Sequence, residues 1–110
     1  MFNFGVNLKE VDAFDLHRRI SEGNDTFKLI DVRTPAEVAQ GKIPGAEHIP
    51  LNLLPMKLAE LPDDQPVIFY CRTGARSAQA CAFVAAQGKD NTYNLSGGIV
   101  SWVRNGLAVA

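Results

Sequence analysis

The sequence has few cysteines, almost no excess of charge and no long apolar run. Its 110 residues include only two cysteines, which are too few for a disulfide scaffold. The formal net charge of -1 gives no indication of binding to nucleic acid or to an anionic membrane surface. No apolar run approaches the roughly 18 residues that a membrane-spanning helix needs. These absences exclude a disulfide-rich secreted scaffold and a transmembrane protein.

Targeting and metal-binding patterns are also missing. The first 14 residues, MFNFGVNLKEVDAF, contain no cationic leader followed by an apolar run and no small-residue cleavage site, so we expect a cytoplasmic protein. The two histidines, His17 and His48, show no ligand spacing, and we expect neither a metal site nor a cofactor. With 46% hydrophobic and 21% charged residues the composition is that of a globular protein, and the length suits one domain over residues 1–110.

The chain alternates between strand-like and helix-like segments. Residues 67–70, VIFY, form a continuous apolar run typical of a central strand covered on both faces. Residues 76–87 are rich in alanine and are followed by Gly88, a residue type that commonly ends helices. Further strands are expected at residues 27–32, 46–49 and 91–95, and further helices at 11–22 (ended by Gly23-Asn24-Asp25), from the Thr34-Pro35 cap onward, at 56–61 and at 99–105. This order predicts an α/β domain with a mainly parallel sheet.

The stretch VIFYCRTGARS places Cys71 between the central strand and the alanine-rich helix. Ligands of open parallel sheets bind outside the carboxyl ends of the strands, and the unpaired N–H groups of a helix N-terminus attract anions. A thiol in such a turn, close to Arg72 and Arg76, commonly has a pKa well below the ordinary value of about 8.5. We therefore predict a preformed thiolate at Cys71.

The rest of this loop suits an anion as well. Gly74 permits a positive φ, so that successive backbone N–H groups can turn inward around the sulfur. Arg72 and Arg76 can offer forked donors to an oxyanion bound beyond it. The residues alone leave an alternative open, in which Cys71 is a small buried core residue and the arginines are simply solvated.

Three stretches of the chain resemble the rhodanese family of single-domain sulfurtransferases. They are IDVRTPAEVAQGKIPGAEHIPL, VIFYCRTGARSAQA and NLSGGIVSWVRNGL, and the resemblance extends over residues 6–109. It implies an α/β, rhodanese-like fold, a parallel five-stranded sheet flanked by helices, with the active loop between a central strand and a helix.

The resemblance also implies a reaction. Cys71 is expected to take the outer sulfur of a donor such as thiosulfate, release sulfite and keep a persulfide. The outer sulfur then passes to cyanide in vitro or, in the cell, to a thiol, which can belong to an acceptor protein. Two arginines in the loop suit a sulfonate dianion better than mercaptopyruvate. The residues implied to bind substrate are Arg72, Thr73, Gly74, Ala75 and Arg76.

Two other functions compete with this one. Related phosphatases and arsenate reductases on this fold have one more residue between cysteine and arginine, so the shorter spacing from Cys71 to Arg76 favours sulfur chemistry. A persulfide carrier, loaded by a partner such as a cysteine desulfurase, stays open as the alternative. The sequence names neither the physiological donor nor the acceptor.

Residues outside the loop are expected to have structural roles. Cys81 lies inside the helix, too far along it for a disulfide with Cys71, and we expect a core cysteine. Within the resemblance, the pattern of Asp31, Arg33 and Glu37 braces the turn beside the active loop, although Arg33 could add to the positive field. The pair Gly97-Gly98 is expected to permit close backbone packing.

Overall fold

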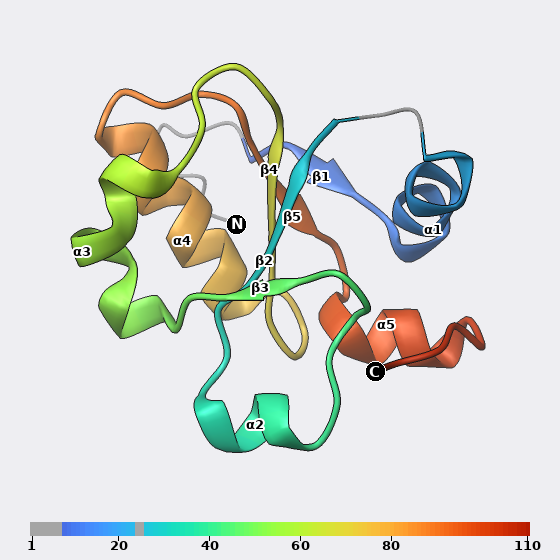
Figure 1. The fold of residues 1–110 in the computed structure, drawn as a ribbon. Coiled ribbons are helices and arrows are strands. Elements are labelled where there is room, and N and C mark those ends of the chain that lie inside the picture. The colour runs from blue at the N-terminus through green and yellow to red at the C-terminus, as the bar shows by residue number, and fades with distance from the viewer. Residues whose placement is uncertain (1–7, 24–25) are drawn as a thin grey trace.

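The computed structural model describes residues 8–23 and 26–110 and contains one five-stranded sheet. All strand pairs in it are parallel, in the order β1-β5-β4-β2-β3 (Figure 1). The strands are β1 (Glu10–Val11), β2 (Lys28–Asp31), β3 (Glu47–His48), β4 (Val67–Tyr70) and β5 (Thr92–Leu95). The predicted α/β fold with a parallel five-stranded sheet is confirmed.

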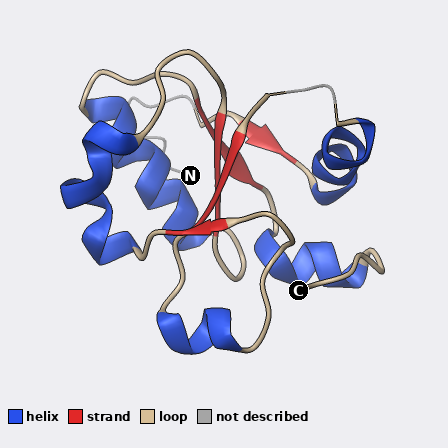
Figure 2. Ribbon diagram, viewed as in Figure 1, coloured by secondary structure: helices blue, strands red, loops and turns tan. Residues whose placement is uncertain are grey.

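Helices cover both faces of this sheet (Figure 2). They are α1 (Ala13–Glu22), α2 (Pro35–Ala39), α3 (Leu54–Lys57), α4 (Ala75–Ala86) and α5 (Gly98–Arg104), with short 3₁₀ turns at Leu51–Leu53 and Leu58–Glu60 on either side of α3. Helices α1 and α5 pack together on one face, whereas α4 lies on the other face against β4 and β5, next to α3. None of the helices within the described ranges is both long and apolar enough to span a bilayer.

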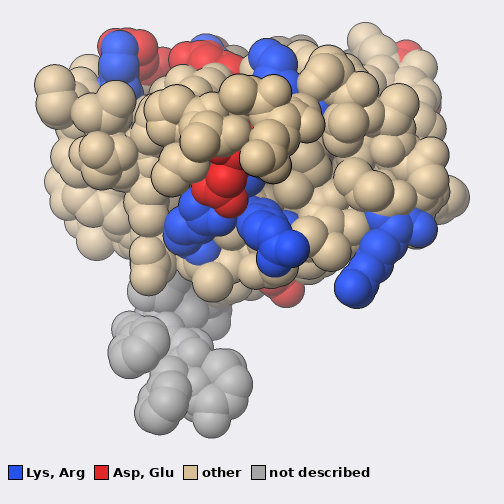
Figure 3. All heavy atoms as spheres, turned by 90° about the horizontal axis from the view of Figure 1, so that it is seen from below, with Lys and Arg blue, Asp and Glu red and all other residues tan. Residues whose placement is uncertain are grey.

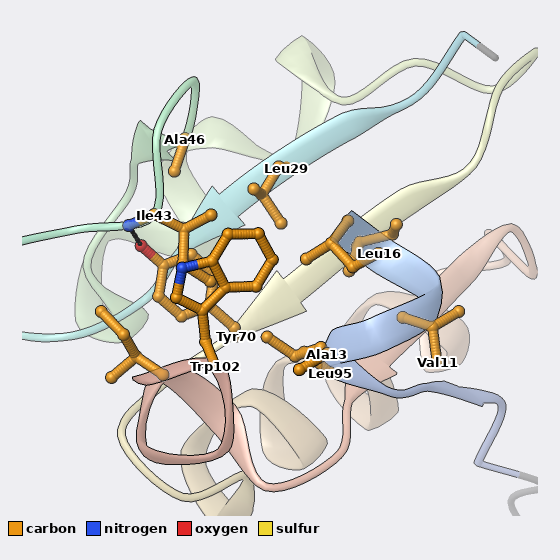
Figure 4. Packing of buried hydrophobic residues seen from close by; sticks show 11 residues of the cluster. Val11, Ala13, Leu16, Leu29, Ile43, Ala46, Tyr70, Leu95 and Trp102 are labelled. Carbon is orange, nitrogen blue, oxygen red and sulfur yellow. Dashed lines mark hydrogen bonds between the residues drawn. The ribbon is translucent and has the colours of Figure 1, made fainter. Parts of the chain in front are cut away.

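The position of β4 in the middle of the sheet explains why its sequence is apolar throughout. Val67 and Phe69 point into the core cluster shared with α4, whereas Ile68 and Tyr70 point into the cluster beneath α1 and α5. Figure 4 shows the second cluster, in which the Tyr70 hydroxyl accepts a hydrogen bond of 3.0 Å from the Ile43 amide. Because both faces of β4 are covered, a run without polar alternation is stable there.

The predicted helix at residues 11–22 starts too early. Val11 belongs to β1 and pairs with Leu95, and the helix begins at Ala13 after Asp12, whose side chain accepts a hydrogen bond of 2.7 Å from the Asp15 amide. A strand of two residues is too short to show alternation, and the apolar Val11 also fits the helical spacing of the residues that follow it. Gly23 ends the helix at φ 69°, as expected, while Asn24 and Asp25 lie outside the described residues.

The helical segment predicted at residues 56–61 also begins earlier. The chain turns into a 3₁₀ helix at Leu51, continues as α3 from Leu54 and ends in a second 3₁₀ turn at Glu60. Pro55 occupies the first turn of α3, where its missing N–H costs no hydrogen bond. Because proline usually indicates a loop or a helix boundary, the sequence does not show that the helical segment starts before Pro55.

The carboxyl ends of β2, β4 and β5 meet at one edge of the sheet. The segments that follow them are the turn from Val32 into α2, the loop from Cys71 into α4 and the Gly97-Gly98 turn into α5. Helix α2 lies at this edge, at the bottom of Figure 1. The fold therefore brings three loops together around Cys71.

Candidate active site

Cys71 follows the last residue of β4, and only 1% of its surface is exposed. Its sulfur accepts hydrogen bonds from Gly74 and Ser77. The Gly74 amide donates one over 3.1 Å, and both the amide and the hydroxyl of Ser77 donate over 3.4 Å. Donors that converge on a sulfur stabilise its anionic form.

These contacts set the ionisation of the thiol. Burial alone raises the pKa of Cys71, because a charge is poorly solvated inside the protein. Hydrogen bonds from the Ser77 hydroxyl and from the amides of Ser77, Gly74 and Thr73 act in the opposite direction, and the resulting pKa lies below the ordinary value. The geometry therefore supports the predicted thiolate.

Gly74 gives the loop its curvature. It has a φ of 113°, a conformation that glycine adopts without strain, and it caps the N-terminus of α4. Its carbonyl oxygen accepts hydrogen bonds from the Ala78 amide, over 3.1 Å, and from the Asn94 side chain, over 3.2 Å. These contacts hold Gly74 in the position from which its own amide reaches the sulfur.

The start of α5 fixes the loop from another side. The amide of Ile99 donates to the Cys71 carbonyl oxygen over 3.0 Å, and the amide of Val100 donates to that of Arg72 over 3.1 Å. Gly98 has a φ of 59°, and a Cβ atom built on it would lie 2.4 Å from the Arg72 carbonyl oxygen. This confirms the expectation that the glycine permits close backbone packing.

The two arginines of the loop differ in their surroundings. Arg76 donates two hydrogen bonds, of 2.7 and 2.9 Å, to the two carboxylate oxygens of Glu37 in α2. This pairing, helped by hydrogen bonds from Thr34, lowers the pKa of Glu37 from its ordinary 4.5 to about 2. Arg72 is exposed, and its side chain has no ion-pair partner within the described ranges. The sequence predicts that both arginines bind the anionic substrate, whereas the Arg76 guanidinium is already paired with the Glu37 carboxylate.

Arg33 has a structural position. It is buried, forms an ion pair of 2.7 Å with Asp31 and donates to the carbonyl oxygen of Gly41 over 2.7 Å and to that of Glu37 over 3.4 Å. These contacts confirm that the Asp31, Arg33 and Glu37 pattern braces the turn after β2. Since Asp31 neutralises the guanidinium, Arg33 adds little to the field at the loop.

The second cysteine and the two histidines have structural surroundings. Cys81 is buried and forms no disulfide with Cys71, and burial raises its pKa to about 12. A ring nitrogen of His48 lies 2.7 Å from the Arg33 carbonyl oxygen, and His17 packs edge-on against Trp102. Among the residues that the structure describes, no cluster of three or more histidine, cysteine, aspartate or glutamate side chains could hold a metal ion.

Sequence analysis missed two residues that contact the loop. Ser77 donates to the sulfur through both its hydroxyl and its amide, and Asn94 holds Gly74 from β5. Ser77 directly follows Arg76 in the first turn of α4, where a hydroxyl can reach a bound anion, so its position offered a signal. No local pattern identified Asn94, because its contact depends on the pairing of distant strands. Of the loop residues in between, Thr73 contributes its amide, and Ala75 begins α4.

Comparison with known proteins gives consistent matches. The rhodanese-like domain model matches residues 12–105. A sulfurtransferase of Allochromatium vinosum is 46% identical over 102 residues, covering 93% of this chain and 94% of that protein. A mitochondrial thiosulfate sulfurtransferase of Saccharomyces cerevisiae is 31% identical, covering 96% of this chain and 80% of that protein. The crystal structure of a rhodanese-related protein from Thermoplasma volcanium, 32% identical, has a TM-score of 0.82 and covers 93% of this chain and 97% of that one. The matched region includes the whole Cys71 loop.

Proposed function

The chain belongs to the rhodanese family, whose single-domain members include sulfurtransferases, and from this membership we propose that it is a thiosulfate sulfurtransferase. The observation that carries the proposal is the convergence of Gly74 and Ser77 on the sulfur of Cys71. Such a site favours a sulfur anion over a neutral thiol. A nucleophile of this kind can accept sulfur without a separate general base.

The first step transfers one sulfur atom to the enzyme. The thiolate of Cys71 attacks the outer sulfur of thiosulfate, and a new bond forms between these two sulfur atoms. The bond between the two sulfur atoms of thiosulfate breaks, and its electron pair leaves with sulfite. Three negative charges are present before and after the step, so no proton has to move.

The second step restores the thiolate. A nucleophilic acceptor, such as cyanide or a thiolate, attacks the outer sulfur of the persulfide, and the electron pair of the broken bond returns to Cys71. The N–H groups that stabilise the thiolate can stabilise the persulfide in the same way, because both anions carry their negative charge on sulfur close to the N-terminus of α4. The site thus alternates between two similar anions.

Arg72 is the best placed residue to hold the sulfonate group of the donor, since its guanidinium is exposed and has no carboxylate partner within the described part of the chain. Arg76 contributes in another way. Its bidentate contact with Glu37 links the first turn of α4 to α2 and keeps the rim of the loop in place. The mitochondrial yeast relative, which is named a thiosulfate sulfurtransferase, supports thiosulfate as the donor.

One observation favours a second function, that of a persulfide carrier loaded by a partner protein such as a cysteine desulfurase. With Arg76 engaged by Glu37, a single loop arginine is available for the sulfonate dianion. A carrier needs the stabilised persulfide but no site for the sulfonate.

The spacing from Cys71 to Arg76, shorter than in related phosphatases, argues against phosphoester hydrolysis. The cytoplasmic location remains a prediction.

A single-turnover experiment separates these functions. The protein is mixed with excess thiosulfate without acceptor, and sulfite is measured over time. A sulfurtransferase releases one sulfite per active site and then stops until cyanide is added, when thiocyanate forms. A carrier releases almost none but gains sulfur from a cysteine desulfurase supplied with cysteine. Release of phosphate from a panel of phosphoesters would contradict both functions.

A further inference from the structure

Asn94 of β5 has a side-chain oxygen that is buried without a partner. Only 2% of the residue is exposed, and its Oδ1 atom accepts no hydrogen bond. Among the side chains of residues 8–23 and 26–110, no other buried nitrogen or oxygen atom is left in this state. Taking an acceptor out of water without giving it a partner costs free energy. An amide at this position therefore needs a reason other than stability.

The nitrogen of the same amide has two partners. Nδ2 of Asn94 donates to the carbonyl oxygen of Gly74 over 3.2 Å and to a carboxylate oxygen of Glu10 in β1 over 3.4 Å. A carbonyl oxygen and an ionised carboxylate only accept hydrogen bonds. If the amide were turned over, its oxygen would face these two oxygens. The observed orientation is therefore the one that suits the surroundings, although it leaves Oδ1 unpaired.

Gly74 is the residue through which this amide can affect the sulfur. The Gly74 amide lies 3.1 Å from the sulfur of Cys71 and donates to it. Glycine rotates freely about its backbone bonds, so the direction of this N–H group depends on what holds the residue. A Cβ atom built on Gly74 would lie 3.7 Å from Nδ2 of Asn94. The Asn94 amide thus packs directly against Gly74 and restrains it.

The contact with Asn94 is not required to pair the Gly74 carbonyl. That oxygen also accepts a hydrogen bond of 3.1 Å from the Ala78 amide in the first turn of α4, and Glu10 is exposed to water. A valine in place of Asn94 would therefore leave no partner of the amide buried and unpaired, and it would remove the unpaired oxygen. Valine is also favoured in strands. The amide is thus the less stable choice for this position.

We propose that Asn94 is a positioning residue for the sulfur chemistry of Cys71, and that its amide, which lowers the stability of the protein, holds Gly74 in the orientation that donates to the sulfur. The inference rests on the proposed function for the rate of reaction, but not for the ionisation of the thiol. Asn94 acts from behind the loop. Lysine and arginine side chains gather on the face that carries α2 and α5, seen in Figure 3, whereas Asn94 is buried in β5 and acts only through Gly74.

The test replaces Asn94 by valine and measures ionisation, rate and stability separately. In Asn94→Val we expect the thiolate fraction of Cys71, measured by ultraviolet absorbance at a pH below its pKa, to fall about threefold. The rate of sulfite release in a single turnover with thiosulfate should fall by at least the same factor. The free energy of unfolding in urea should equal or exceed that of the wild type. This combination distinguishes positioning from a merely structural role.

Thr92→Val is the matched control. Thr92 is buried two residues earlier on the same face of β5, and its side chain is hydrogen-bonded to Cys81 instead of the loop. This variant makes the same kind of change, from a polar side chain to valine, and should leave the thiolate fraction of Cys71 unchanged. Asn94→Ala, whose side chain is too small to clash, repeats the ionisation measurement and should give the same fall with a lower stability than Asn94→Val.

An unchanged thiolate fraction in Asn94→Val or Asn94→Ala would overturn the proposal. So would a loss of stability in Asn94→Val as large as that in Asn94→Ala, because Asn94 would then be a packing residue. A wild type that ionises Cys71 but releases no sulfite would instead reject the proposed function, and the thiolate fractions of the variants would still decide the role of Asn94.

Discussion

The hydroxyl of Ser77 lies 3.4 Å from the sulfur of Cys71, and the Ser77 amide lies at the same distance. One residue in the first turn of α4 thus donates twice to the group that reacts. No other residue in the described part of the chain supplies two hydrogen bonds to this sulfur. The ionisation of Cys71 therefore depends on Ser77 more than on either arginine of the loop.

Replacing this hydroxyl should raise the pKa of Cys71. Ser77→Ala removes one donor but keeps the amide, and a hydrogen bond of about 1 kcal/mol corresponds to roughly a fivefold smaller thiolate fraction at a pH below the pKa. The ultraviolet absorbance of the thiolate, recorded against pH, measures this change. Ser101→Ala serves as the control, because Ser101 lies in α5 and does not contact the sulfur. An identical titration in Ser77→Ala and wild type would refute the role of the hydroxyl.

The contact between Glu37 and Arg76 should appear in the pH dependence of stability. Because the pKa of Glu37 in the folded protein, about 2, lies below its ordinary 4.5, its contribution is complete above about pH 4.5 and is lost as the pH falls through 2. The unfolding free energy of the wild type should therefore fall more steeply over this range than that of Glu37→Gln.

Urea unfolding at a series of pH values tests this expectation. Glu22→Gln, which removes an exposed carboxylate of α1, controls for the loss of one negative charge. Parallel pH profiles for the wild type and Glu37→Gln would show that the ion pair contributes nothing to stability in acid.

The two loop arginines should differ in kinetics. Arg72→Ala should lower kcat/KM for thiosulfate about tenfold or more, as expected for a lost charge-assisted hydrogen bond of about 1.5 kcal/mol, while the melting temperature stays constant. Arg76→Ala should lower both kcat/KM and the melting temperature, because it leaves Glu37 unpaired beside the loop. Unchanged kinetics in both variants would show that neither arginine contributes to the reaction with thiosulfate.

Gly98 should tolerate no side chain. In Gly98→Ala the new Cβ would meet the Arg72 carbonyl oxygen at 2.4 Å, so the loop or α5 must move, and we expect a loss of more than about 3 kcal/mol. Gly106→Ala is the control, since Gly106 also has a positive φ, of 76°, but open space around it, and should cost only about 1 kcal/mol. Chemical unfolding of both variants gives the comparison, and equal losses would show that backbone strain alone matters at Gly98.

The sequence was sufficient where a pattern was local. The apolar run ending at Tyr70 marked the central strand, Thr34 and Pro35 marked the start of α2, and Gly74 marked a turn with a positive φ. Each of these follows from the steric or hydrogen-bonding properties of neighbouring residues. The position of Cys71 between β4 and α4 followed from the same patterns.

The sequence was insufficient where contacts connect distant segments. Arg76 pairs with Glu37 across 39 positions, and Asn94 reaches Gly74 across 20, so neither contact leaves a local pattern. Val11 belongs to β1, a two-residue strand that forms by pairing with β5 and has no pattern of its own. Contacts between segments that are distant in the sequence, and not local propensity, determine these features.

The central claim is that Cys71 carries the transferred sulfur. Its most direct test is the intact mass of the wild type, Cys71→Ser and Cys81→Ser after incubation with thiosulfate and removal of the excess. We predict a gain of one sulfur atom in the wild type and in Cys81→Ser, lost on addition of cyanide, and no gain in Cys71→Ser. A folded wild type that gains no sulfur, or a Cys71→Ser variant that still gains it, would contradict this account.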